Sequence, residues 1–303
     1  MSTESLTDIL TEAEPSWLDR HEYPFVPRYF GVDHHWMHYV EEGRHGEPIV
    51  FVHGTPTWSF LWRRLILLMR DSNRCVASDH LGFGLSDKPT QPSLLTPERH
   101  AERLESLLLS LDLPKFTMVV HDFGGPIGLS VAMKHPELVK RLVVINSWLW
   151  PIGEEPGARR MSRMLGGGVG RYLYVSLNLS AKRMLPRVFA DRENLSRALH
   201  DQYVGPFLDK KARLGPWVLA RSLNSSQAFF QSLWDQREVL KQFPMLLLWG
   251  AKDPLFGKSL GTWERAFPDA EVVLCQRSGH FPQEEQPDLV ISEISKFVRE
   301  GLH

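Results

Sequence analysis

Residues 116–126 read Phe116-Thr117-Met118-Val119-Val120-His121-Asp122-Phe123-Gly124-Gly125-Pro126. The first half is a compact apolar run, which is typical of a buried strand covered on both faces. The second half is a sharp turn that leads into an apolar stretch with helical spacing. This segment therefore predicts a strand, a tight turn and a helix, with the carboxylate of Asp122 at the bend.

Short apolar runs flanked by Gly, Pro and Asp recur on both sides of this segment. The runs that we predict as strands are Trp36–Val40, Pro48–His53, Arg74–Asp79, Phe116–His121, Leu142–Asn146, Met245–Trp249 and Glu271–Cys275. The stretches that we predict as helices are Pro97–Leu111, Gly124–Lys134, Leu260–Phe267 and Pro287–Arg299. Alternating strands and helices predict an α/β domain with a mostly parallel sheet between two layers of helices.

The alternation stops between residues 151 and 241, where the sequence is helical or loop-like and offers no convincing strand pair. This stretch carries 15 Lys and Arg against 8 Asp and Glu, a balance typical of a solvated helical surface. We therefore predict a core domain of residues 1–150 and 242–303 and an inserted helical cap of residues 151–241.

Composition excludes several broad classes of function. The net charge of −1 over 303 residues provides no general attraction to nucleic acid. No apolar run reaches the roughly 20 residues needed to cross a bilayer, and the N-terminus lacks the pattern of a signal peptide. Cys75 and Cys275 lie in separate apolar runs, which favours two buried free thiols over a disulfide or a metal site. We expect a cytoplasmic protein without metal or cofactor; the sequence leaves the oligomeric state open.

Two other segments carry polar residues at the ends of predicted strands. Asp253 lies in Gly250–Pro254, and His280 lies in Ser278-Gly279-His280-Phe281-Pro282. The order Asp122, Asp253, His280 resembles the nucleophile–acid–base order of α/β-hydrolases. Taken alone, Asp122 could equally be a helix N-cap, but three residues at three successive expected places indicate a catalytic triad.

The same resemblance implies an oxyanion site made of backbone N–H groups. One comes from Thr55 in the turn after His53-Gly54, and the other from Phe123, next to the nucleophile. A carboxylate that attacks a saturated carbon forms an alkyl ester, which water can hydrolyse, whereas a serine would form an ether. The aspartate therefore indicates halide displacement or opening of a strained oxygen ring.

Longer motifs resemble the haloalkane dehalogenase family and span most of the chain outside the cap. They are His53-Gly54-Thr55-Pro56-Thr57-Trp58-Ser59-Phe60-Leu61-Trp62-Arg63, Asp79-His80-Leu81-Gly82-Phe83-Gly84-Leu85-Ser86-Asp87-Lys88-Pro89, His121–Gly128, Gly250–Pro254 and Gly279–Gln283. The resemblance implies an enzyme that acts on a small apolar organic substrate with water. Asn146 follows one predicted strand where some members carry the acid, so the resemblance assigns that role to Asp253.

Two departures concern the halide site that the family resemblance implies. The residue after the nucleophile is normally a tryptophan, but Phe123 has no N–H to donate. Thr55 stands where an asparagine is common. Trp148, Trp150 and Trp217 lie in or next to the predicted cap and are possible halide-binding or pocket residues, although packing in the core or at its rim is the commoner role for such tryptophans.

These departures leave alternatives open. Bacterial β-lactone decarboxylases resemble this sequence and use the same aspartate without a halide site. Epoxide hydrolases share the triad but need cap tyrosines as proton donors, for which Tyr172, Tyr174 and Tyr203 are available. A non-catalytic ligand receptor on the same fold would not need an intact triad. We rank dehalogenase first, lactone decarboxylase second and epoxide hydrolase third.

Overall fold

The computed structural model describes residues 14–152 and 164–300. Within these ranges eight strands form one sheet in the order β1-β2-β4-β3-β5-β6-β7-β8. Their bounds are β1 Arg28–Val32, β2 His35–Glu42, β3 Ile49–Val52, β4 Cys75–Ser78, β5 Phe116–Asp122, β6 Val139–Ser147, β7 Met245–Gly250 and β8 Glu271–Cys275. The pairs β1–β2 and β2–β4 are antiparallel and all others are parallel, which confirms the predicted α/β-hydrolase type of sheet.

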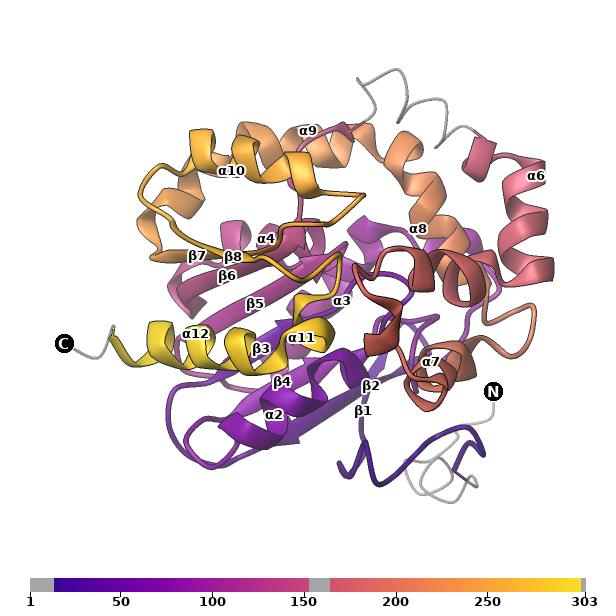
Figure 1. The fold of residues 1–303 in the computed structure, drawn as a ribbon, viewed down its shortest axis with the longest axis horizontal. Helices are drawn as coiled ribbons and strands as arrows, with labels where there is room; N and C mark the ends of the chain where they lie inside the picture. Colours follow the sequence, from indigo (N-terminus) through magenta and orange to yellow (C-terminus); the bar gives the residue numbers. More distant parts are fainter. Residues whose placement is uncertain (1–13, 153–163, 301–303) are drawn as a thin grey trace.

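Alternate side chains of the central strands enter two separate hydrophobic cores. In β5, Met118 and Val120 belong to one core, and Val119 belongs to the other. The first core is closed by α3 (Pro97–Ser110), α4 (Gly124–Lys134) and α10 (Leu260–Ala266). The second is closed by α2 (Arg63–Met69) and α12 (Pro287–Glu300). Figure 1 shows these two sets of helices on opposite faces of the sheet.

The predicted elements of the core agree with the structure to within a few residues. Gly124–Lys134 and Glu271–Cys275 have the predicted bounds, and β6 begins three residues earlier than Leu142. β1, α2 and the short helix α11 (Pro282–Glu285) were not predicted. β1 was not recognised as a strand because its burial pattern is irregular and none of its residues is fully buried. It therefore lacks the alternation that identifies a strand.

Between β6 and β7 the described chain is helical, and we call residues 151–241 the cap segment. Its α- and π-helical elements are α6 Gly168–Arg171, the π-helical turns η5 Tyr172–Ser176 and η6 Ser180–Met184, α7 Arg197–Val204, α8 Leu214–Ser225 and α9 Gln227–Asp235. The short 3-10 helices η7 Leu185–Arg187, η8 Arg192–Asn194, η9 Gly205–Phe207 and η10 Arg237–Gln242 lie between or after them. Figure 1 shows α6, α7 and α8 beyond one end of the strands. The cap segment therefore lies across an edge of the sheet, where side chains from the strand ends meet it.

Cys75 and Cys275 are both buried and free, as predicted. Burial raises the pKa of each thiol to about 12, so neither is a reactive thiolate at neutral pH. Among the described residues, no helix combines the length and the apolar character that a bilayer crossing requires.

Candidate active site

Asp122 is the last residue of β5 and has a backbone φ of 51°, in the left-handed region that costs a non-glycine residue about 1–2 kcal/mol. Two glycines make room for this bend. A Cβ on Gly124 would lie 2.1 Å from the carbonyl oxygen of Val52, and one on Gly54 would lie 2.2 Å from Asp122 Oδ1. The strand, the strained residue and the helix form the predicted turn and lift the carboxylate away from the sheet.

A hydrogen bond on one side and an ion pair on the other hold the Asp122 carboxylate. The backbone N–H of Thr55 donates to Oδ1 over 2.8 Å, and His280 Nε2 lies 3.5 Å from Oδ2. His280 Nδ1 is in turn 2.9 Å from Asp253 Oδ2. The three side chains are almost fully buried, so the structure brings Asp122, His280 and Asp253 together in the predicted order.

The electrostatics of this chain favour a charged imidazole. Burial lowers the pKa of His280, but the charge of Asp253 and hydrogen bonds to both carboxylates outweigh burial and raise this pKa to about 10. Burial raises the pKa of Asp253, but His280 and the N–H of Leu255 outweigh it, and the net shift is downward. At neutral pH the protonated form of His280 is therefore favoured, with its ring between the side chains of Asp122 and Asp253.

Asn146 holds Asp253 from the other side, a role that sequence reasoning missed. Its Nδ2 donates to Asp253 Oδ2 over 2.7 Å, and its Oδ1 accepts from the N–H of Gly250 over 2.9 Å. Asn146 is fully buried at the end of β6. Its uncharged side chain had indicated only where the acid does not lie, whereas the structure shows that it orients the acid.

His121, just before the elbow, orients the His280 loop and was also missed. Burial, followed by the proximity of His280, lowers the pKa of His121 to about 3, so its ring is neutral. Its Nε2 lies 2.8 Å from the carbonyl oxygen of His280, and this nitrogen therefore carries the proton and donates. A histidine inside an otherwise apolar buried strand is the sequence signal for such a role.

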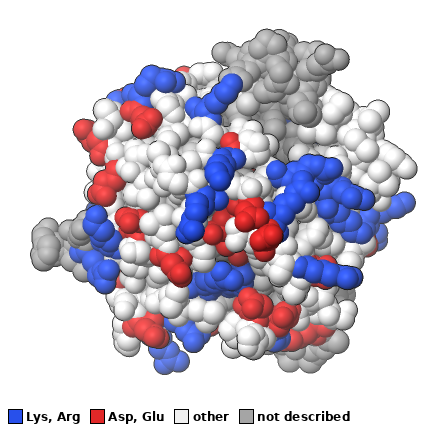
Figure 2. Space-filling view, in the orientation of Figure 1, with Lys and Arg blue, Asp and Glu red and all other residues white. Residues whose placement is uncertain are grey.

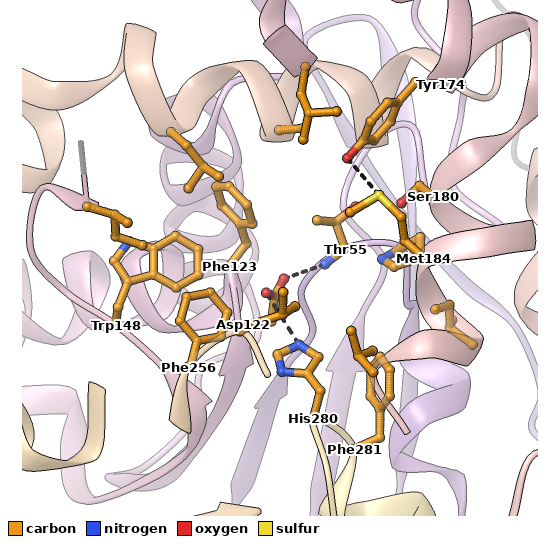
Figure 3. Close-up of a pocket in the computed structure, with 18 residues that line it drawn as sticks. Thr55, Asp122, Phe123, Trp148, Tyr174, Ser180, Met184, Phe256, His280 and Phe281 are labelled. Atoms are coloured by element: carbon orange, nitrogen blue, oxygen red, sulfur yellow. Dashed lines mark hydrogen bonds and ion pairs between the residues drawn. The ribbon is translucent and has the colours of Figure 1, made fainter. Parts of the chain in front are cut away.

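A cavity of about 230 Å³ opens above Asp122 (Figure 3). Most of its wall is apolar. The residues that line it are Thr55, Pro56, Asp122, Phe123, Trp148, Ile152, Leu165, Tyr174, Ser180, Met184, Leu185, Val188, Ala220, Leu223, Leu255, Phe256, His280 and Phe281. An apolar wall around one buried carboxylate suits an uncharged organic molecule rather than a charged one.

Of the three tryptophans predicted near the halide site, Trp148 lines the cavity. Its ring stacks on Phe256 at 4.7 Å and meets Phe123 edge-on at 4.7 Å. Trp150 packs instead against other tryptophans, and Trp217 lies 5.7 Å from the guanidinium of Arg221. Neither Trp150 nor Trp217 is among the lining residues, because packing within the cap segment or against the core occupies both rings.

Polar atoms without a strong partner mark the cavity wall. Thr55 Oγ1 and the indole N–H of Trp148 are buried and have no hydrogen-bond partner in the structure. From the cap segment, the Tyr174 hydroxyl donates only to the thioether sulfur of Met184, over 3.3 Å. Figure 3 shows this hydroxyl directed into the cavity on the side opposite Asp122. These groups are the available donors for a polar atom of a substrate.

The sequence offered three cap tyrosines as proton donors, and the structure places Tyr174 alone of the three at the cavity wall. Tyr172 is 60% exposed on the outer surface. The Tyr203 hydroxyl donates to Glu284 over 2.5 Å and so fastens α7 to the core. Burial and then the charge of Asp122 raise the pKa of Tyr174 above its ordinary value, so this phenol is protonated at neutral pH.

An elbow, a buried acid–base pair and a cavity under an inserted helical segment define an α/β hydrolase. The family described as "alpha/beta hydrolase fold" matches residues 47–287. Haloalkane dehalogenase 2 of Mycobacterium tuberculosis (strain ATCC 25618 / H37Rv) is 33% identical over 90% of this chain and 94% of its own. The cis-3-alkyl-4-alkyloxetan-2-one decarboxylase of Shewanella oneidensis is 32% identical over 91% of this chain and 89% of its own.

Solved structures agree with the sequence relatives. A haloalkane dehalogenase from Agrobacterium tumefaciens C58 superposes with a TM-score of 0.81 at 26% identity, covering 91% of this chain and 96% of that one. The chain therefore belongs to the haloalkane dehalogenase family of α/β hydrolases, and lactone decarboxylases are close relatives. This confirms the resemblance that the sequence motifs indicated.

Proposed function

We propose that this protein is a hydrolytic haloalkane dehalogenase that forms a covalent ester on Asp122. The observation that carries the proposal is a carboxylate on a left-handed strand-to-helix residue, facing an apolar cavity and backed by His280 and Asp253. The proposal assigns the core to residues 1–150 and 242–303 and the substrate-enclosing cap to residues 151–241. Two buried free thiols support a reducing, cytoplasmic location.

In the first step a carboxylate oxygen of Asp122 attacks the carbon that bears the halogen. A carbon–oxygen bond forms, and the halogen leaves with the electron pair of its bond to carbon. Phe123 offers no side-chain donor to the halide, but the Thr55 hydroxyl and the Trp148 indole N–H are buried at the cavity wall without partners and are available to bind it. The apolar wall keeps water away from the attacking carboxylate.

In the second step water hydrolyses the ester with His280 as the base. While Asp122 is charged, it helps to raise the pKa of His280 to about 10. Esterification removes that charge, so the pKa of His280 falls and the imidazolium releases its proton to solvent. The neutral imidazole then accepts a proton from the attacking water, Asp253 stabilises the imidazolium, and backbone N–H groups of Thr55 and Phe123 bind the oxyanion. The oxyanion collapses, the bond between the Asp122 carbonyl carbon and the alkyl oxygen breaks, and His280 returns the proton to the departing alcohol, which regenerates the carboxylate.

Trapping the ester tests this proposal. The variant His280→Phe is incubated with haloalkanes, epoxides or β-lactones, and the intact protein is weighed. Without its base the enzyme accumulates the ester, and the mass increase identifies the substrate class. The double variant Asp122→Asn/His280→Phe is the control and gains no mass. A wild-type enzyme that consumes haloalkane while His280→Phe gains no mass contradicts the ester on Asp122, and inertness to all three classes supports a non-catalytic receptor.

A second candidate is the opening of a strained oxygen ring, either a β-lactone or an epoxide. The Tyr174 hydroxyl supports it, because this protonated phenol faces the cavity with only a thioether as acceptor. The alkoxide that leaves an opened epoxide needs such a donor more than a halide does, whereas a β-lactone attacked at its saturated carbon releases a carboxylate. The trapping experiment with His280→Phe distinguishes the two candidates. If a lactone or an epoxide gives an adduct and haloalkanes give none, ring opening replaces dehalogenation as the proposed function.

A further inference from the structure

The outer surface of the cap segment exposes several large apolar side chains. Val169 is 66% exposed, Tyr172 60%, Leu177 52% and Leu208 60%. Large apolar side chains that are exposed singly are common on proteins, but a group of them marks an interaction site. The question is whether these four side chains form one surface.

Spacing and hydrogen bonds place them together. Tyr172 follows Val169 by three residues, and Leu177 follows Tyr172 across the π-helical turn η5, in which one turn takes more residues than in an α-helix. Leu208 joins from the next part of the chain, because the guanidinium of Arg213 bonds the carbonyl oxygens of Ser176 and Leu208. We call these four residues the apolar cap patch.

Exposed cations surround the apolar cap patch. Between residues 164 and 190 the sequence contains no acidic residue, and between 208 and 213 Asp209 is the only one. In addition to Arg171, the exposed cations of these two segments are Lys182, Arg183, Arg187, Lys210 and Lys211. None of these five side chains forms an ion pair within the described residues. Figure 2 shows Lys and Arg gathered at the right-hand side, where Figure 1 places this part of the cap segment.

The same short segment forms the wall of the cavity on its inner side. Tyr174, Ser180, Met184 and Leu185 line the cavity, whereas Tyr172, Leu177, Lys182 and Arg183 alternate with them and face outward. The cavity wall is apolar, so its ligand is a molecule that dissolves poorly in water and partitions into lipid. The surface and the cavity are therefore separated by a single layer of chain.

We propose that the apolar cap patch and its cations dock on an anionic lipid bilayer, from which the cavity takes its apolar substrate. Exposed Leu and Val enter the boundary between headgroups and acyl chains, and Tyr172 suits the interface because its ring is apolar and its hydroxyl polar. Unpaired Lys and Arg bind the anionic headgroups, which favours this partner over a neutral membrane. Docking itself does not depend on the proposed reaction; the supply of substrate does.

Vesicle binding tests the docking. The full-length protein is sedimented with vesicles of phosphatidylcholine alone or of phosphatidylcholine mixed with phosphatidylglycerol. Wild type is expected to bind the mixed vesicles at least tenfold better, and added salt is expected to weaken the binding. Two variants, Leu177→Ser/Leu208→Ser and Lys182→Glu/Arg183→Glu, should each lose most of it. Equal binding of wild type to both kinds of vesicle overturns the proposal.

Matched controls change the same residue types far from the patch. Leu68→Ser/Leu109→Ser alters two exposed leucines of α2 and α3, and Arg44→Glu/Lys115→Glu reverses two exposed cations of the core. Both controls should bind mixed vesicles as wild type does. If the control variants lose as much binding as the cap variants, the apolar cap patch is not the docking surface. Light scattering tests whether the patch instead binds a second copy of the chain. If wild type is a dimer and Leu177→Ser/Leu208→Ser is a monomer, the docking proposal is overturned.

A last arm separates docking from chemistry. A short-chain substrate in solution should be turned over equally by wild type and by Lys182→Glu/Arg183→Glu, since neither residue lines the cavity. A long-chain substrate embedded in mixed vesicles should be turned over at least fivefold more slowly by the variant. Equal rates on the embedded substrate overturn the supply of substrate from the bilayer. If no compound is turned over at all, the proposed function fails while vesicle binding still tests the docking.

Discussion

The floor of the cavity and its roof are built in opposite ways. On the floor, Asp122, His280 and Asp253 follow three strands of one sheet, and each carboxylate accepts a backbone N–H. The roof comes from the cap segment, with π-helical turns, and its Tyr174 hydroxyl bonds only a sulfur. Rigid elements and paired charges suit the positioning of a nucleophile, whereas irregular helices with weakly held polar atoms suit variation in the substrate.

This contrast implies that chemistry depends on the floor and substrate preference on the roof. The largest expected effect is that of Asp122→Asn. An amide is a far weaker nucleophile than a carboxylate and cannot form the ester, so we expect turnover to fall by about a thousandfold or more. The initial rate of alcohol or halide release measures it. Full activity in the asparagine variant, without deamidation back to aspartate by mass, refutes the covalent mechanism.

Next in size is the effect of Asn146→Ala on the support of the floor. The substitution leaves the Gly250 N–H without its buried partner and removes one of the two contacts of Asp253 Oδ2, whose other partner is His280 Nδ1, at a cost of about 1–3 kcal/mol. We expect hydrolysis of the ester to slow by about tenfold, since Asp253 no longer orients His280 fully. Single-turnover kinetics separate this step from ester formation.

The control for Asn146→Ala is Asn73→Ala. Asn73 is buried to a similar extent, and its amide donates to the carbonyl oxygen of Glu47, remote from the site. Chemical denaturation should show both variants destabilised, with slower ester hydrolysis in Asn146→Ala alone. If both variants hydrolyse the ester at equal rates, Asn146 has only a packing role, and Asp122, His280 and Asp253 alone form the catalytic floor.

The strand ends of the floor could be predicted from short segments of sequence, and the roof could not. Asp122 was identifiable because glycines must follow a strained bend, and His280 because it follows the last strand. The support from Asn146 and His121 depends on where two loops meet in space. Tyr174 and Tyr172 are two residues apart, so any helix places them on different faces, and the sequence alone does not show which face meets the cavity; the structure places Tyr174 there and exposes Tyr172.

A pH titration of stability sharpens the comparison on the floor. The folded pKa of His280, about 10, lies above its ordinary value of 6.5. The protonated form is therefore the one that folding stabilises, fully below pH 6.5 and progressively less as the pH rises through about 10. We expect the free energy of unfolding of wild type, relative to that of His280→Gln, to decrease between pH 7 and pH 10.

The difference between wild type and variant is needed because partly buried Lys88 acts in the opposite direction. Burial lowers its pKa to about 8, so its contribution to stability improves as the pH rises. Denaturation curves at several pH values measure both proteins under the same conditions. A constant difference from pH 7 to pH 10 means that Asp122 and Asp253 do not hold a proton on His280 in the folded state.

The smallest expected effect is that of Tyr174→Phe on haloalkane turnover, and it tests the roof. A halide leaves as an anion without needing a proton, so removal of the hydroxyl should change kcat/KM for haloalkanes by about threefold or less. For an epoxide, the leaving alkoxide would lose its donor, and kcat should fall by about a hundredfold. Tyr172→Phe, on the outer surface, should leave both rates unchanged. A large loss of kcat/KM for haloalkanes would show that Tyr174 takes part in the dehalogenation reaction. The roof would then contribute to the chemistry as well as to substrate preference.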